Sequence, residues 1–342
     1  MPGSNRIVKH TVVSSGLHDA DIRPPALLGE FKRLSLRDAA TFFSGTDALE
    51  HVACPACGAI ETPEAFSKDG FTYAECGGCQ SLFVSPRPRA ALLARYYAES
   101  EAGRFRAAQF AGGTAVQRRH HLLRANAAWI GRLVEEECAL PAQPCYADVR
   151  TYAPQIFDEV AELGIFDALY ALDPQAGLDA HCGATVHAVA LADAPELHAI
   201  SAFEKLEHQH APQTFLESLR DRLAPGGLLF LTTRTSSGFD LQTLWDKAPY
   251  IFVPEHLNLL SIAGLEILVQ RSGLELIELS TPGQLDVELV FQACAADPSI
   301  VLPRFLETLL AARGPLAHGD FQAFLQKHRL SSHVRLALRK PT

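Results

Sequence analysis

The sequence lacks any long hydrophobic run. No stretch approaches ~20 uninterrupted apolar residues, the length that a membrane-spanning helix needs, so no membrane span is expected. The N-terminus carries Arg6, Lys9 and His10 but no apolar core of the kind found in secretory signal peptides. We therefore expect neither insertion in a membrane nor export, and we predict a cytoplasmic location.

An excess of positive charge is also missing. The chain has 30 Lys and Arg against 39 Asp and Glu, a formal net charge of −9, so no general basic field would attract nucleic acid or anionic membranes. Residues 327–340 are a basic exception, which we interpret as a solvated helix face with a basic tail. With 48% hydrophobic and 20% charged residues over 342 positions, the composition is that of a globular protein long enough for two domains.

The cysteines are few and unevenly placed. Four of the eight form two close pairs, in CPACG at residues 54–58 and CGGC at residues 76–79. The other four are scattered and are expected to be buried small hydrophobes rather than disulfide partners, in keeping with a reducing compartment: Cys138, Cys145, Cys182 and Cys294.

The two cysteine pairs have the spacing of a zinc ribbon. Each pair offers two thiolates to one tetrahedral ion, the glycines let backbone amides turn towards the sulfurs, and residues 71–74 between the pairs alternate like a strand. We predict a ribbon over residues 51–86 and a structural Zn²⁺, since a four-sulfur site leaves no position for substrate. Free or redox-active cysteines and an iron site are the alternatives. The predicted ligands are Cys54, Cys57, Cys76 and Cys79.

From residue 145 onward, short apolar runs alternate with helical segments, which predicts an α/β fold with a doubly wound, mainly parallel seven-stranded sheet. We expect the last two strands to form an antiparallel pair at one edge. The expected strands are 146–149, 168–173, 185–191, 199–203, 227–233, 274–279 and 286–294, and the main helices are 156–163, 212–223 and 262–272.

The pattern divides the chain into five parts. Before the ribbon stands an N-terminal extension, residues 1–50. A helical cover, residues 87–144, separates the ribbon from the α/β domain and has helices expected from residue 89 or 90 and over 115–139. The α/β domain spans residues 145–295, and a C-terminal helical extension spans residues 296–342.

In this order of segments the chain resembles the zinc-ribbon-containing class I S-adenosylmethionine (SAM)-dependent methyltransferases of sugar and natural-product pathways. The matching segments are residues 54–97, AFEKLEH at 202–208, LAPGG at 223–227 and PEHLN at 254–258. The resemblance implies that Asp148 opens the SAM loop, that Asp173 accepts hydrogen bonds from the ribose hydroxyls, and that Asp193 lies near the adenine. The alternative for each is a strand-end or turn carboxylate without a ligand.

The SAM loop departs from the pattern of this family. Where the family has Asp-x-Gly-x-Gly-x-Gly, the three glycine positions carry Arg150, Tyr152 and Pro154, and no glycine occurs between Asp148 and Gly164. Side chains would project where the methionine part of SAM lies against bare backbone. Three outcomes stay open: SAM binds in a changed way, the pocket takes another ligand, or Arg150 and Tyr152 fill it.

Histidines follow two of the expected strands. His256 in PEHLN is our first candidate for a base that accepts the proton of a hydroxyl or amine, and His208 is the second. The alternative for both is a histidine that only caps a helix or bonds within the core. The polar segment SSHVR at residues 331–335 could bind a phosphate or carboxylate, or only cap a helix.

Three functions remain open on the sequence. The first is a SAM-dependent methyltransferase for a small sugar-like or nucleotide-linked substrate. The second is a non-catalytic pseudoenzyme of the same fold, acting as a scaffold or partner subunit. The third is an enzyme that keeps the cleft but performs other chemistry. The glycine-free loop favours the second and third, whereas Asp148, Asp173 and His256 favour the first or third.

Overall fold

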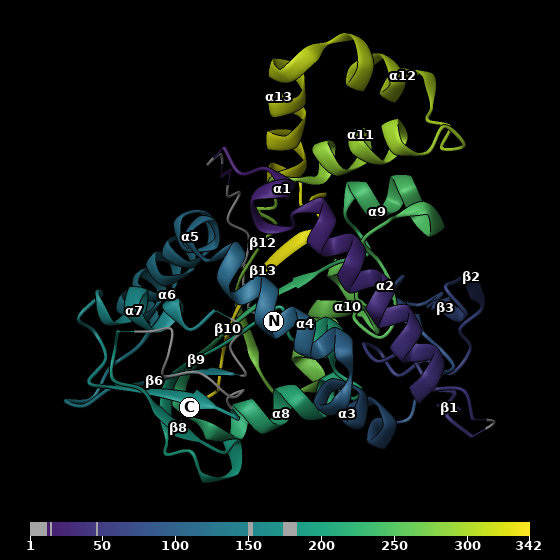
Figure 1. Ribbon diagram of the computed structural model, residues 1–342. Helices are drawn as coiled ribbons and strands as arrows, with labels where there is room; N and C mark the ends of the chain where they lie inside the picture. Colours follow the sequence, from purple (N-terminus) through teal and green to yellow (C-terminus); the bar gives the residue numbers. More distant parts are fainter. Residues whose placement is uncertain (1–11, 14–15, 46, 150–152, 174–182) are drawn as a thin grey trace.

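The computed structural model describes residues 12–13, 16–45, 47–149, 153–173 and 183–342, and its centre is a seven-stranded sheet (Figure 1). Across the sheet the strands run in the order β12-β13-β10-β9-β6-β7-β8, and among them only β13 runs antiparallel to its neighbours. The doubly wound, mainly parallel fold is therefore confirmed. The bounds are β6 Cys145–Val149, β7 Ala168–Leu172, β8 His187–Val189, β9 Leu197–Phe203, β10 Leu223–Arg234, β12 Glu275–Ser280 and β13 His333–Arg339.

Helices cover both faces of the sheet, which is why its central strands are mostly apolar. On one face, α6 (Arg124–Glu137) and α7 (Gln155–Ala161) pack Trp129 and Phe157 against Tyr146 and Phe230. On the other, α8 (Pro212–Arg222) and α10 (Ile262–Arg271) pack leucines against β9, β10 and β13. The hydroxyl of Ser261 caps α10 by accepting the Gly264 N–H at 2.8 Å.

The seventh strand is not where the sequence analysis places it. Residues 286–294, predicted as a strand, belong to helix α11 (Asp286–Ala296), and the seventh strand is β13, which lies between β12 and β10 and within the segment predicted to be a helical extension. The buried residues of α11 include Val287, Val290 and Ala293, spaced three apart as on one helix face. In β13, Val334, Leu336 and Leu338 alternate as a strand requires.

The ribbon forms a separate four-stranded antiparallel sheet. It contains β2 (Glu64–Lys68), β3 (Phe71–Glu75), β4 (Leu82–Val84) and, from the distant α/β domain, β11 (Asn258–Leu259). A two-stranded ladder of β1 (Leu49–Glu50) with β5 (Arg87–Pro88) follows, and α3 (Ala90–Glu99) begins where predicted. The fourth strand makes the ribbon part of the same folded body as the sheet domain.

Helices from both ends of the chain complete the molecule. The N-terminal part contributes α1 (Asp19–Ile22), α2 (Pro25–Phe42), α4 (Glu101–Gly113) and α5 (Ala115–Arg118), with α2 and α4 side by side in Figure 1. A π-helical turn, Arg119–Leu123, leads into α6. After α9 (Phe239–Leu244), the helices α11, α12 (Arg304–Glu307) and α13 (Gly314–Lys327) form a group at one end of the molecule (Figure 1). None of the helices in the described ranges has the length and hydrophobicity needed to cross a membrane.

Candidate functional site: a four-cysteine cluster and a charged cavity

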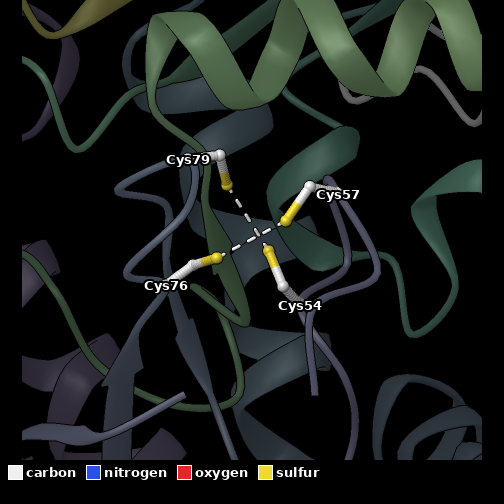
Figure 2. Close-up of side chains that lie close together, drawn as sticks. All are labelled: Cys54, Cys57, Cys76 and Cys79. Atoms are coloured by element: carbon white, nitrogen blue, oxygen red, sulfur yellow. Dashed lines mark hydrogen bonds between the residues drawn. The ribbon is translucent and has the colours of Figure 1, made fainter. Parts of the chain in front are cut away.

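The four predicted metal ligands converge on one point, as Figure 2 shows. The Sγ atoms all lie within 4.8 Å of one another, with 3.6 Å between Cys54 and Cys79 and 3.4 Å between Cys57 and Cys76. A tetrahedral ion with zinc–sulfur bonds of about 2.3 Å would hold its sulfurs about 3.8 Å apart. The cluster therefore has the size and the donor set for one tetrahedral metal ion.

The ribbon is fixed to the sheet domain beside this cluster. Arg271 in α10 donates to the Ala56 carbonyl at 2.7 Å, and the Ser261 hydroxyl donates to the Cys79 carbonyl. Tyr73 in β3 donates to the His256 carbonyl at 3.1 Å. The segment that carries His256 is thus held between the cysteine ribbon and the sheet.

A cavity of about 360 Å³ lies at the carboxyl edge of the sheet, where open α/β folds bind ligands. Its floor is formed by the ends of β6, β9 and β10 and the start of β13, and residues 118–126 line its wall. Strand pairing places Phe203 beside Thr232, Thr232 beside Arg335, and Arg234 beside His333. Directly paired residues share a face, so these five side chains belong to the face that bounds the cavity.

Asp148 lies at this edge as predicted. Its side chain is buried and lines the cavity, and it accepts a hydrogen bond from the Ser201 hydroxyl, which is bonded in turn to Tyr146. These two linked hydroxyl groups fix the position of the Asp148 carboxylate.

Glu204 and Lys205, directly after β9, are functional candidates to which the sequence analysis assigns no role beyond their place in the AFEKLEH segment. Glu204 has φ of +52°, a strained value for a residue with a Cβ, and its carboxylate is accessible from the cavity. Burial opposes its ionisation, but His333 and Arg118 outweigh burial and lower the pKa of Glu204. Burial and the Arg106 guanidinium lower the pKa of Lys205 to about 7. Strain beside perturbed charges is typical of a functional site.

His208 and His256 both line this cavity, with their ring centroids 6.4 Å apart. Burial lowers the pKa of His256 to about 3 and that of His208 well below its usual range, so both rings are neutral near pH 7. The Nδ1 atom of each is buried without a hydrogen-bond partner in the described part of the chain. The Glu255 carboxylate lies 3.8 Å from the His208 Nδ1 and is held by Arg106. Two neutral imidazoles therefore offer unsatisfied nitrogen atoms at the cavity wall.

The other predicted site residues lie elsewhere. Neither Asp173 nor Asp193 is among the described residues that line the cavity, so His256 faces the same cavity as Asp148 but not as Asp173. An oxygen of Asp173 accepts the Leu191 N–H at 3.0 Å, which ties the end of β7 to the turn after β8, and Asp193 is exposed in that turn.

Of the three residues at the glycine positions, Arg150 and Tyr152 lie outside the described residues. Pro154 lines the cavity and directly precedes α7, where its missing N–H removes no helical hydrogen bond.

Comparison with known proteins finds a family match over most of the sheet domain. Residues 138–279 match the family model of a methyltransferase domain. These residues include strands β6 to β10 and most of β12 of the doubly wound sheet, which is methyltransferase-like. No curated protein matches the chain in sequence.

Among solved structures, the plantazolicin methyltransferase BpumL, solved with S-adenosylhomocysteine (SAH) and a desmethylPZN analog, is 12% identical with a TM-score of 0.45, over 74% of this chain and 95% of its own. A SAM-dependent methyltransferase from Clostridium acetobutylicum is 7% identical with a TM-score of 0.39, over 66% and 97%. Coclaurine N-methyltransferase is 13% identical with a TM-score of 0.39, over 63% and 72%.

Proposed function

We propose that the protein is a SAM-dependent methyltransferase for a small polar acceptor, of the sugar-like or nucleotide-linked kind that the sequence resemblance implies. The observation that carries the proposal is the convergence of Asp148, Glu204 and His256 on one cavity at the carboxyl edge of a methyltransferase-type sheet. A hydrogen-bonded acid, a strained strand-end carboxylate and neutral imidazoles in one cavity are the groups that such a reaction uses.

The described residues suit the charged half of SAM. Asp148 accepts hydrogen bonds and suits the ammonium group, Glu204 presents a carboxylate that suits a sulfonium, and Lys205 supplies a cation for the carboxylate. Bound SAM would supply an electrophilic methyl group. We assign the ribose to Asp173 and the adenine to Asp193, as the resemblance implies.

The histidines suit the acceptor side. A hydroxyl or amine that receives a methyl group must lose a proton, and a neutral imidazole with an unsatisfied Nδ1 can accept it. His256 is the first candidate for this role, because the ribbon and Phe252 hold its backbone, and His208 is the second.

For the ribbon we propose one Zn²⁺ held by the four cysteine sulfurs. All four positions of a tetrahedral ion would be taken by Cys54, Cys57, Cys76 and Cys79, so the ion stabilises the ribbon and meets no substrate.

Calorimetric titration with SAM tests the function. We expect micromolar affinity for the unchanged protein and at least a tenfold loss, about 1.4 kcal/mol, in Asp148→Asn, which removes the charge but keeps an acceptor for Ser201. Asp320→Asn on exposed α13 is the matched control and should bind as the unchanged protein does. If neither SAM nor SAH binds the unchanged protein, the non-catalytic scaffold with Arg150 and Tyr152 in the pocket becomes the better reading.

A further inference from the structure

Three side chains at the β10–β13 end of the cavity are left without a role by the function proposed above. They are Arg234 at the end of β10 and His333 and Arg335 at the start of β13, and together we call them the arginine corner. His333 pairs directly with Arg234, and Arg335 follows two residues later on the same face. Two of the three belong to the polar segment at residues 331–335 that the sequence alone leaves unexplained.

Arg335 is a half-buried cation that pairs with no carboxylate among the described residues. One guanidinium nitrogen donates to the Asn126 amide oxygen at 2.8 Å, and the guanidinium lies over the Trp129 ring at 5.4 Å from its centroid. In the described part of the chain it forms no ion pair, and its Nε atom is buried without a hydrogen-bond partner. The nearby Glu278 is bound by Arg132 and by the Trp129 indole. A half-buried guanidinium that is held by neutral groups, with its Nε atom buried, leaves both a charge and a donor to be satisfied.

Arg234 adds a second unused donor. Its terminal nitrogen pairs with Asp240 at 2.5 Å, and its guanidinium stacks on Tyr250 at 4.3 Å from the ring centroid. Its Nε atom, however, is buried and finds no partner among the described residues. These contacts hold the guanidinium plane rigidly while one N–H group stays unsatisfied beside the cavity.

The carboxylates of the cavity do not neutralise this corner. The charge of Glu204 is stabilised by four basic groups, those of His333, Arg118, Arg23 and Arg106. Glu255 is held by Arg106, and Asp240 is already paired with Arg234. Asp286 also lines the cavity and stabilises the charge of Arg234, but its oxygens already accept hydrogen bonds from Ser331, Ser332 and Gln322, and none of these carboxylates pairs with Arg335. An anion with oxygen acceptors, of a size that the cavity admits, would satisfy the Nε donors of Arg234 and Arg335.

We propose that the arginine corner binds an oxyanion of the methyl acceptor, a phosphate or a carboxylate. The assignment rests on the proposed function, and it places the acidic group on the side of the cavity away from Asp148, since β13 and β10 are separated from β6 by β9. Planar guanidinium groups match both oxyanions. The acceptor is thus an acidic small molecule that lies between the arginine corner and the part of the cavity wall formed by His208 and His256.

Titration calorimetry with methyl phosphate and with acetate, in the presence of saturating SAH and at constant ionic strength, tests the assignment. We expect the unchanged protein to bind one of the two, and the better ligand to identify phosphate or carboxylate chemistry. Arg335→Gln should weaken that binding at least tenfold, and Arg335→Lys, which keeps the charge but loses the planar group, should weaken it severalfold. If Arg335→Gln does not fold, the severalfold loss of binding expected for Arg335→Lys is the test.

The matched control is Arg339→Gln, because Arg339 lies on the same strand and face but forms surface ion pairs with Glu275 and Glu137. It should leave anion binding unchanged within twofold. The inference is overturned if neither anion binds, if Arg339→Gln weakens binding as much as Arg335→Gln, or if the anion competes with SAH. Because SAM binding is measured separately, Arg335-dependent anion binding without SAM binding would refute the methyltransferase and keep the anion site.

Discussion

A single methyl group added at Gly264 should disturb the joint between the ribbon and the sheet domain. Gly264 lies in the first turn of α10, where a Cβ would meet the Ser81 Oγ at 2.1 Å and the Ala56 Cβ at 3.2 Å. Ser81 cannot turn aside freely, because its hydroxyl accepts the Ser261 N–H at 3.1 Å and lies within hydrogen-bond distance, 3.2 Å, of the Cys79 sulfur. The helix and the ribbon must therefore separate, or these hydrogen bonds must break.

The size of the effect follows from two opposing terms. Overpacking of this kind lowers the free energy of unfolding by about 1–3 kcal/mol, whereas replacing a helical glycine by alanine raises it by up to about 1 kcal/mol. We expect Gly264→Ala to lower the free energy of unfolding by about 1–2 kcal/mol. Gly29→Ala in α2 is the matched control: no atom lies within 4 Å of its added Cβ, so it should raise the free energy of unfolding by about 0.5–1 kcal/mol.

Urea unfolding measures both variants, and release of metal to a chromogenic chelator reports on the ribbon. Gly264→Ala should unfold at lower urea and release metal faster, and Ser81→Ala in the same chain should cost less than the sum of the single changes. If Gly264→Ala proves as stable as Gly29→Ala and releases metal at the unchanged rate, the ribbon is not packed on α10 as described.

Two further predictions concern the metal and pH. Elemental analysis should find one zinc ion per chain, and less than about half an ion per chain would refute the site. Cys76→Ala should abolish zinc binding and increase hydrogen exchange in the ribbon more than in the sheet. Cys294→Ala should change neither. Burial lowers the folded-state pKa of His256 from 6.5 to about 3, so the unfolded chain binds more protons between these values and stability falls as pH drops through 6.5. Between pH 7.5 and pH 5, the urea midpoint should fall less in His256→Gln than in the unchanged protein, whereas in His51→Gln, at an exposed position, it should fall as much as in the unchanged protein. An equal fall in the two variants and the unchanged protein would contradict a buried, neutral His256 ring.

The sequence predicts most of the sheet because its signal is local. β6, β7, β9, β10 and β12 are apolar runs flanked by turns, and the buried-strand pattern identifies them. The segment at residues 286–294 is a short apolar run in which strand and helix cannot be distinguished by length, and its partners, Gln322 and Ser331, lie far along the chain. The seventh strand, β13, lies between β12 and β10, but its basic residues and the helices that precede it in the chain obscure the strand pattern in the sequence.

The site is predicted less completely for a similar reason. Spacing alone locates the cysteines, because the ligands of each pair are neighbours in sequence. The position of Asp148 follows from the end of the predicted strand. The backbone strain at Glu204, in contrast, cannot be predicted from the residue type at that position. His333 and Arg335 reach the cavity only because β13 pairs with β10, a contact across about a hundred residues that no local pattern encodes.

A crystal structure of the protein with SAH tests the central claim most directly. The account predicts SAH at the carboxyl edge of the sheet, with its amino group at Asp148, its ribose at Asp173 and its sulfur facing the cavity that His256 and Glu204 line. SAH bound elsewhere, or a cavity closed by the side chains of Arg150 and Tyr152 at saturating SAH, would contradict the claim and leave the domain a methyltransferase fold without methyltransferase chemistry.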